Sequence, residues 1–227
     1  NRYYAAGLQP RTAVGNPYGE GYYDDFNTAV GLDSAGRTQL HHKGKLVIGV
    51  ENTPTVIFDL RQFLVIDWGG VVGQIGMGQH GTAFAHAGMR MGPAICYEGL
   101  YGDFYGDFVR RGAQFMAIIS NDGWWGDTPG YKHLFTISRL RAIEHRRAIA
   151  RSANTGMSGF ISARGDIGET LGWEKRGVIS AAVPLNSELT FYTRYGDYLG
   201  RISEYLTLLC VLYYIAYRVK RKNYLVK

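Results

Sequence analysis

The chain has 227 residues, of which 46% are hydrophobic and 31 are glycine, so it can bury a full core and is not a disordered protein. Its net charge of +6 is concentrated at the C-terminus, in Arg218, Lys220, Arg221, Lys222 and Lys227, because residues 1–217 carry 20 basic and 19 acidic side chains. Such a nearly neutral body argues against a nucleic-acid partner, and two cysteines 114 positions apart exclude a disulfide framework.

The histidines do not predict a metal site. There are six, and His41 and His42 are adjacent rather than spaced like metal ligands on one helix face. The chain begins at Asn1 without a signal peptide, and we expect it to be the C-terminal part of a longer protein.

The first part of the chain predicts few regular elements. Residues 1–23 are rich in Gly, Tyr and Pro and predict a loop. A strand, a turn and a second strand are expected at 27–32, 33–36 and 39–42. An apolar stretch at 56–66 is compatible with a short helix, and 68–81, with six glycines, predicts a loop.

From residue 89 onward the pattern becomes regular. Residues 91–95 predict a strand, 101–111 a helix that Gly112 ends, and the apolar run 115–119 a strand covered on both faces. Residues 121–130 then predict a loop at a strand end.

A second helix and three more strands complete the domain. The helix is indicated by apolar residues that recur every three positions: Leu134, Ile137, Leu140 and Ile143. Its other sides would carry four arginines: Arg139, Arg141, Arg146 and Arg147. The expected strands are 158–162, 178–183 and 189–193.

Alternating strands and helices predict a layered α/β or α+β domain. In such domains the ligand cleft lies beyond the carboxyl ends of the strands. Cys96 and Asn121 both follow apolar strands, so we expect both to face that cleft.

The C-terminal segment differs in kind. Residues 205–217 contain no charge, and the longer stretch 202–219 would be about 27 Å long as a helix, close to the roughly 30 Å of a bilayer core. Length leaves a buried core helix and a membrane span equally open. Tyrosines near both ends and the basic tail favour a membrane anchor, with the tail in the cytoplasm and the main domain on the opposite side.

Cys96 is the candidate nucleophile. It ends an apolar strand, Glu98 follows two residues later, and Gly99 permits a sharp turn. A thiol reacts as the thiolate, so neighbouring charges decide its reactivity. The alternative is a small buried side chain, which describes most free cysteines.

Two lysines could act with this thiol. Lys43 or Lys45 could stabilise a thiolate and the oxyanion of a tetrahedral intermediate, and Glu51 could pair with Lys43 and orient it. The alternative for each of them, and for Glu98, is a solvated side chain at the surface. A Cys–His pair is the competing arrangement, with three candidate histidines: His80, His86 and His133.

Three segments together resemble a known superfamily. They are HKGKLVIGVE at 42–51, AICYE at 94–98 and SNDGWWGD at 120–127. In this order they are similar to the motifs of the nitrilase, or carbon–nitrogen hydrolase, superfamily, and more narrowly to its integral membrane members, the apolipoprotein N-acyltransferases. Segments 139–144, 151–156 and 195–198 continue the match, so the resemblance covers roughly residues 25 to 218.

The resemblance implies a fold and a set of site residues. The fold is an α-β-β-α sandwich, here incomplete and followed by a transmembrane helix, and the catalytic group is a Glu-Lys-Cys triad. Cys96 matches the nucleophile, Lys43 the lysine and Glu51 a supporting glutamate. Tyr97 and Glu98 match the residues that flank the nucleophile.

The resemblance also implies an activity without metal or cofactor. A phospholipid gives an acyl chain to the cysteine as a thioester, and the amine of a diacylglyceryl-cysteine on an apolipoprotein then accepts it. The expected location is the bacterial inner membrane with the catalytic domain on the periplasmic side. The expected divisions are a catalytic part at 1–198, a transmembrane helix at 199–219 and a basic cytoplasmic tail at 220–227.

One member of the triad has no match. The family's general-base glutamate lies upstream of the lysine in a Pro-Glu segment, and Glu20 stands in a different context. We therefore expect these 227 residues to be inactive alone. Two other functions stay open: a membrane-tethered amide hydrolase and an inactive membrane-anchored binding domain. Loops 68–81 and 121–130, the latter with Trp124 and Trp125, could gate a lipid cleft.

Overall fold

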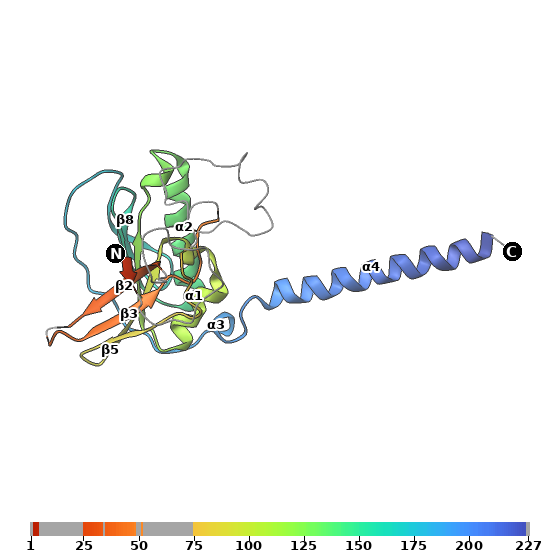
Figure 1. Cartoon of the computed structure of the whole chain (residues 1–227), viewed down its shortest axis with the longest axis horizontal. Coiled ribbons are helices and arrows are strands. Elements are labelled where there is room, and N and C mark those ends of the chain that lie inside the picture. Colours follow the sequence, from red (N-terminus) through yellow and green to blue (C-terminus); the bar gives the residue numbers. More distant parts are fainter. Residues whose placement is uncertain (1, 5–24, 34, 49–50, 52–74, 226–227) are drawn as a thin grey trace, which may run out of the picture.

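The computed structural model describes residues 2–4, 25–33, 35–48, 51 and 75–225. These residues form a mixed α/β domain and one long helix that extends away from it (Figure 1). The smaller of two sheets is antiparallel, in the order β1-β2-β3, with strands Arg2–Tyr4, Asp25–Leu32 and Thr38–His42. The predicted strands at 27–32 and 39–42 are thus confirmed, and the predicted loop at 1–23 is wrong for residues 2–4.

The larger sheet has six strands in the order in which they occur along the chain. They are β4 Phe84–His86, β5 Met89–Ile95, β6 Phe115–Ser120, β7 Ile149–Ala153, β8 Ser158–Ile161 and β9 Ile167–Leu171. β5, β6 and β7 are parallel, and the others pair antiparallel. Parallel neighbours need crossover connections, which two helices supply: α1 Gly102–Arg110 and α2 Pro129–His145.

Both crossover helices pack on the same face of the six-stranded sheet. Their buried side chains, among them Phe108 and Phe135, form one cluster with Met116, Ile118 and Ile149 of the strands. α1 ends before Gly112, which has φ +97°, as predicted. α2 begins at a Thr128 cap with Pro129 in its first turn, so both helices have sequence-encoded ends.

The buried face of α2 is not the one that the three-residue spacing predicted. Leu140 and Ile143 are exposed, whereas the helix buries Leu134, Phe135, Ser138, Arg141, Ala142 and His145. A three-residue step turns 60° less than a full helical turn, so residues at this spacing lie progressively farther from the side of the helix that faces the sheet. Arg141 and Arg147, expected on the outer sides, are buried.

Three further predictions need correction. Residues 178–183 form no strand, and 189–193 lead into the short helix α3 Phe191–Tyr195, capped by Thr190. Strand β6 is buried on one face only, since Ile119 is 50% exposed. The predicted helix at 56–66 lies outside the described residues.

The small sheet lies against the β4 edge of the large one. The side-chain amide of Gln39 on β3 donates to the carbonyl of Ala85 and accepts from its backbone N–H, at 2.9 and 2.8 Å. The ring of His41 meets Phe108 of α1 edge-on, with the ring centroids 4.8 Å apart. The end of β3 is therefore held beside β5 and α1.

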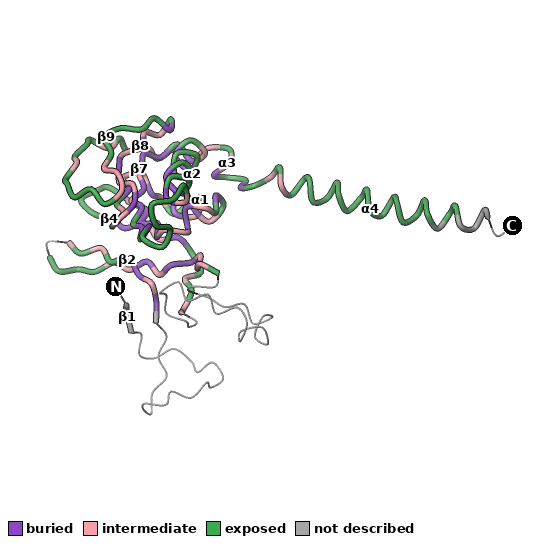
Figure 2. The backbone as a smooth tube through the Cα atoms, turned by 90° about the horizontal axis from the view of Figure 1, so that it is seen from above, coloured by how far each residue is buried: buried purple, intermediate pink, exposed green. Residues whose placement is uncertain are grey.

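The chain ends in α4, Tyr198–Leu225. Within the described residues, 198–218 form one helix long and apolar enough to cross a membrane, and none of that stretch is buried against the domain (Figure 2). The alternative of a buried core helix is therefore wrong. Burying so many apolar side chains requires a partner outside the described chain.

Candidate active site

Cys96 lies at the carboxyl end of β5, where the strand gives way to the 3₁₀ helix Cys96–Leu100. Its φ of +46° is left-handed, a conformation that costs a side-chain-bearing residue about 1 kcal/mol or more. Its side chain is partly exposed. Ile95 pairs with Ile119, so Cys96 and Asn121 stand at the same edge of the sheet. That this edge forms the ligand cleft stays a prediction.

Glu98 is completely buried under this turn. Its carboxylate accepts hydrogen bonds from the backbone N–H of Ile95 and of Gly44, both at 2.6 Å. It also lies 3.1 Å from Nε2 of His41. This carboxylate therefore ties the turn at Cys96 to the chain that follows β3.

Lys43 directly precedes Gly44, and its side chain is only 2% exposed. Its ammonium Nζ lies 2.7 and 2.8 Å from the two carboxylate oxygens of Glu51. The predicted Lys43–Glu51 pair therefore exists. A buried ammonium held by both oxygens of one carboxylate is fixed in direction.

Glu51 is itself held by other donors. Asn27 Nδ2 donates to Oε1 at 3.0 Å, and the backbone N–H of Val47 donates to Oε2 at 2.8 Å. Lys45 has different surroundings: its Nζ lies 5.3 Å from the ring centroids of Tyr101 and Phe104. Of the two candidate lysines, Lys43 has the carboxylate partner.

Tyr97 follows Cys96 and has a half-buried side chain. Its ring meets that of Tyr101 edge-on, with the centroids 5.6 Å apart.

The three histidines that could have formed a Cys–His pair are His80, His86 and His133, and all three are exposed. Among the described residues, no hydrogen bond joins any of them to residues 95–98. Within the described ranges, no cluster of three His, Cys, Asp or Glu side chains could hold a metal ion.

The loop after β6 contains a second buried ion pair. Asp122 accepts from Nη2 of Arg151 at 3.0 and 2.9 Å, and both side chains are buried. Asn121 Oδ1 accepts from Asn154 Nδ2 at 2.8 Å, which joins the ends of β6 and β7. Trp124 and Trp125 in the same loop are exposed.

Sequence reasoning missed His41 and Arg151 as members of this region. Both are polar residues at inward positions of strands, which was the available signal. A lone polar residue in a strand does not identify its partner, since Glu98 is 57 positions from His41. Residues 68–74 lie outside the described chain, so part of the glycine-rich loop stays a prediction. Glu20, which the sequence does not match to the family's general base, also lies outside it.

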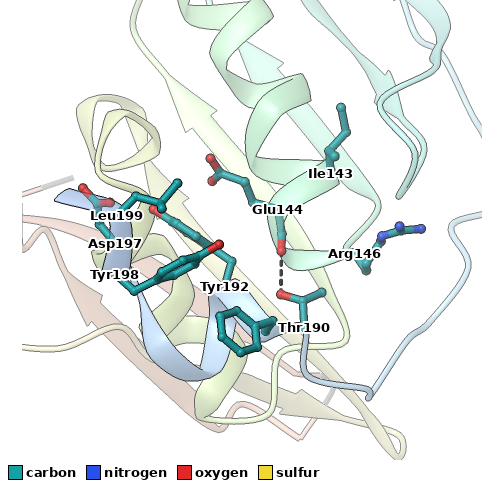
Figure 3. Close-up of a pocket in the computed structure, with 9 residues that line it drawn as sticks. Ile143, Glu144, Arg146, Thr190, Tyr192, Asp197, Tyr198 and Leu199 are labelled. Carbon is teal, nitrogen blue, oxygen red and sulfur yellow. Dashed lines mark hydrogen bonds between the residues drawn. The ribbon is translucent and has the colours of Figure 1, made fainter. Parts of the chain in front are cut away.

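A pocket of about 550 Å³ lies elsewhere, where α2 ends and α4 begins (Figure 3). Its walls include Glu144, Thr190, Tyr192 and Tyr198, and none of the five predicted site residues lines it. Burial raises the pKa of Glu144, although its Oε2 lies 3.2 Å from Nη1 of Arg141. The pocket therefore lies where the domain connects to α4.

The sequence profile of the carbon–nitrogen hydrolase family matches residues 3–189. An apolipoprotein N-acyltransferase of Chlorobaculum tepidum is 36% identical over 181 residues, covering 77% of this chain and 34% of that protein. One of Verminephrobacter eiseniae is 34% identical over 192 residues, covering 80% of this chain and again 34% of the relative. The chain thus spans about a third of the length of these relatives.

Solved structures agree on the fold. A Cys-to-Ala variant of an amidase from Nesterenkonia sp. AN1, of the nitrilase superfamily, superimposes with a TM-score of 0.54 at 16% identity, covering 80% of this chain and 63% of the amidase. Another structure of an amidase from Nesterenkonia sp. has a TM-score of 0.51 at 14% identity, with 81% and 63% of the two chains covered. The predicted nitrilase-like α/β fold is confirmed.

Proposed function

This chain belongs to the carbon–nitrogen hydrolase family, and we propose that it carries the nucleophile and lysine of an apolipoprotein N-acyltransferase. The observation that supports this most is the buried Lys43–Glu51 pair. Glu98 links Gly44, the residue after Lys43, to the turn that bears Cys96. A thiol and a fixed ammonium on linked segments suit acyl transfer.

In the proposed first step the Cys96 thiolate attacks the ester carbonyl of a phospholipid. The tetrahedral oxyanion forms near the ammonium of Lys43, which stabilises it by charge and hydrogen bonding. Collapse breaks the ester C–O bond, the lysophospholipid leaves as its alcohol after taking a proton, and a thioester remains on Cys96.

In the second step the α-amine of a diacylglyceryl-cysteine on an apolipoprotein attacks the thioester. The C–S bond breaks, an amide forms, and the thiol of Cys96 takes up a proton. Both steps need a proton acceptor and donor. We assign that role to a glutamate upstream of Lys43, as the family resemblance implies, and neither step uses a metal or cofactor.

The membrane is the second part of the proposal. Helix α4 would span the inner membrane over residues 199–219, with 1–198 on the periplasmic side and 220–227 in the cytoplasm. Basic residues that follow an apolar span favour the cytoplasmic side. This arrangement would hold the domain at the membrane surface, within reach of phospholipid and of lipid-modified apolipoprotein.

The test is acyl transfer from a phospholipid with a labelled fatty acid to the full-length protein in detergent. Wild type should acquire label that hydroxylamine releases, and Cys96→Ala and Cys96→Ser should acquire none. Label that remains on residue 96 peptides of Cys96→Ala would contradict the proposal. Hydrolysis of small amides without any lipid transfer would favour the membrane-tethered amide hydrolase instead.

A further inference from the structure

His41 is a buried histidine with one partner and no role in the two steps above. It lies on β3, is 1% exposed, and its Nε2 is 3.1 Å from both carboxylate oxygens of Glu98. In the tautomer that carries the ring proton on Nε2, the imidazole donates to a carboxylate whose two oxygens also accept backbone N–H bonds. Among the described residues Nδ1 has no hydrogen-bond partner.

Glu98 in turn holds two separate chain segments together. One is the turn at Ile95, which precedes Cys96, and the other is Gly44, which follows Lys43. Both backbone bonds are 2.6 Å long, and Glu98 is completely buried. The direction of this carboxylate therefore affects where the thiol and the ammonium stand relative to one another.

His41 is placed to set that direction. It lies two residues before Lys43, and both residues are buried. Its Nε2 meets both oxygens of the carboxylate, whereas each backbone N–H reaches one oxygen. The ring is fixed by Phe108, so it offers a donor in a constant position.

We propose that His41 is a positioning residue: through Nε2 it orients the Glu98 carboxylate between Gly44 and Ile95, and so places Lys43 for the Cys96 thiol. The proposal rests on the acyl transfer proposed above. His41 itself touches neither the thiol nor the lysine ammonium in the described hydrogen bonds.

Removing the donor should slow the chemical step more than substrate binding. A misplacement of about 1 Å between reacting groups can cost about 100-fold in rate. His41→Phe keeps a ring against Phe108 but has no N–H, so we expect kcat for thioester formation to fall about 10- to 100-fold while KM changes less than about twofold. His41→Gln has an amide N–H at the position of Nε2 and should recover a large part of that loss.

His42→Phe is the matched control. His42 is the next residue on β3, its Nδ1 lies 2.8 Å from Oγ1 of Thr28, and its ring stacks on Phe26 rather than on the Glu98 side. The same substitution there should leave kcat within about threefold of wild type. A fall in kcat of equal size in both variants would show a general effect on β3 and overturn the proposal.

A double-mutant cycle tests whether His41 acts through Glu98. In the full-length protein, His41→Phe combined with Glu98→Gln should be no slower than Glu98→Gln alone. If the fall in rate of the double variant is the product of the falls in the two single variants, the proposal is overturned. It is also overturned if His41→Phe forms the thioester at the wild-type rate. If His41→Phe does not fold, the comparison of His41→Gln with wild type decides: similar rates support the proposal, and a loss as large as that of Glu98→Gln overturns it.

A substrate-free readout separates this proposal from the proposed function. A nearby ammonium speeds alkylation of a thiol at neutral pH by favouring the thiolate. Iodoacetamide should therefore label Cys96 several-fold more slowly in His41→Phe than in wild type, measured by mass spectrometry of the Cys96 peptide so that Cys210 does not interfere. Wild type that alkylates as expected but transfers no acyl chain would refute the proposed function alone. Equal alkylation in both proteins would refute the role of His41 alone.

Discussion

Replacing Glu51 by alanine should destabilise the protein more than replacing its lysine partner. Glu51 accepts hydrogen bonds from three groups: Lys43 Nζ, Asn27 Nδ2 and the N–H of Val47. In Glu51→Ala all three lose their partner at once. In Lys43→Met the carboxylate keeps two donors and remains 18% exposed to water.

The size of the difference follows from burial. The Lys43 side chain is 2% exposed, so Glu51→Ala leaves a buried ammonium without the carboxylate that it pairs with among the described residues. Breaking a buried ion pair in this way costs about 3–5 kcal/mol. Lys43→Met leaves a carboxylate with partial solvation and two hydrogen bonds, which should cost about 1–3 kcal/mol.

The assay is equilibrium unfolding by urea in detergent, followed by tryptophan fluorescence. Arg164→Ala is the control, because Arg164 and Asp166 lie 3.7 Å apart with side chains 80% and 68% exposed. Loss of such a surface pair should cost less than about 1 kcal/mol. If Lys43→Met is as destabilised as Glu51→Ala, or if Glu51→Ala matches the surface control, the buried-charge reasoning is wrong.

Two further predictions concern the turn at Cys96 and a buried histidine. Because residue 96 has φ +46°, Cys96→Gly should be more stable than Cys96→Ala by about 1 kcal/mol, although neither forms a thioester; equal unfolding midpoints would show that the turn relaxes without a Cβ penalty. Burial lowers the pKa of His145 from 6.5 to about 3, so the unfolded chain binds the proton more tightly and stability falls as the pH drops from 6.5 towards 3, by up to about 1.4 kcal/mol per pH unit. His145→Gln should reduce this slope in unfolding curves between pH 7 and 4, and an unchanged slope would assign the acid sensitivity to other groups.

Some helices and strands could be predicted from the sequence because their local pattern agrees with their burial in the tertiary structure. The apolar runs before Cys96 and Asn121 predicted β5 and β6, and Gly112 predicted the end of α1. The segments around Val178 and Leu189 were apolar enough to suggest strands. They formed none, since whether a short apolar run pairs depends on neighbours that no local pattern specifies.

The site was predicted unevenly for the same reason. Lys43 and Glu51 are eight positions apart, and that short separation made their pairing a reasonable prediction. His41 and Glu98 are 57 positions apart, so nothing local indicated their contact. Helix α2 shows the limit within one element: its presence was predicted, and its buried face was not.

By itself, the sequence determined the chemical groups and their order: a lone thiol after an apolar strand, a lysine and glutamate on the preceding segment, and an apolar helix before a basic tail. Side-chain type and local periodicity are properties of the sequence and do not depend on the fold. Only the tertiary structure decided which groups meet, because hydrogen bonds and ion pairs act over a few ångströms. Glu98 met His41 and Gly44 because β3 lies beside the end of β5, and the contact with Glu51 is what distinguishes Lys43 from Lys45 as the lysine of the proposed reaction.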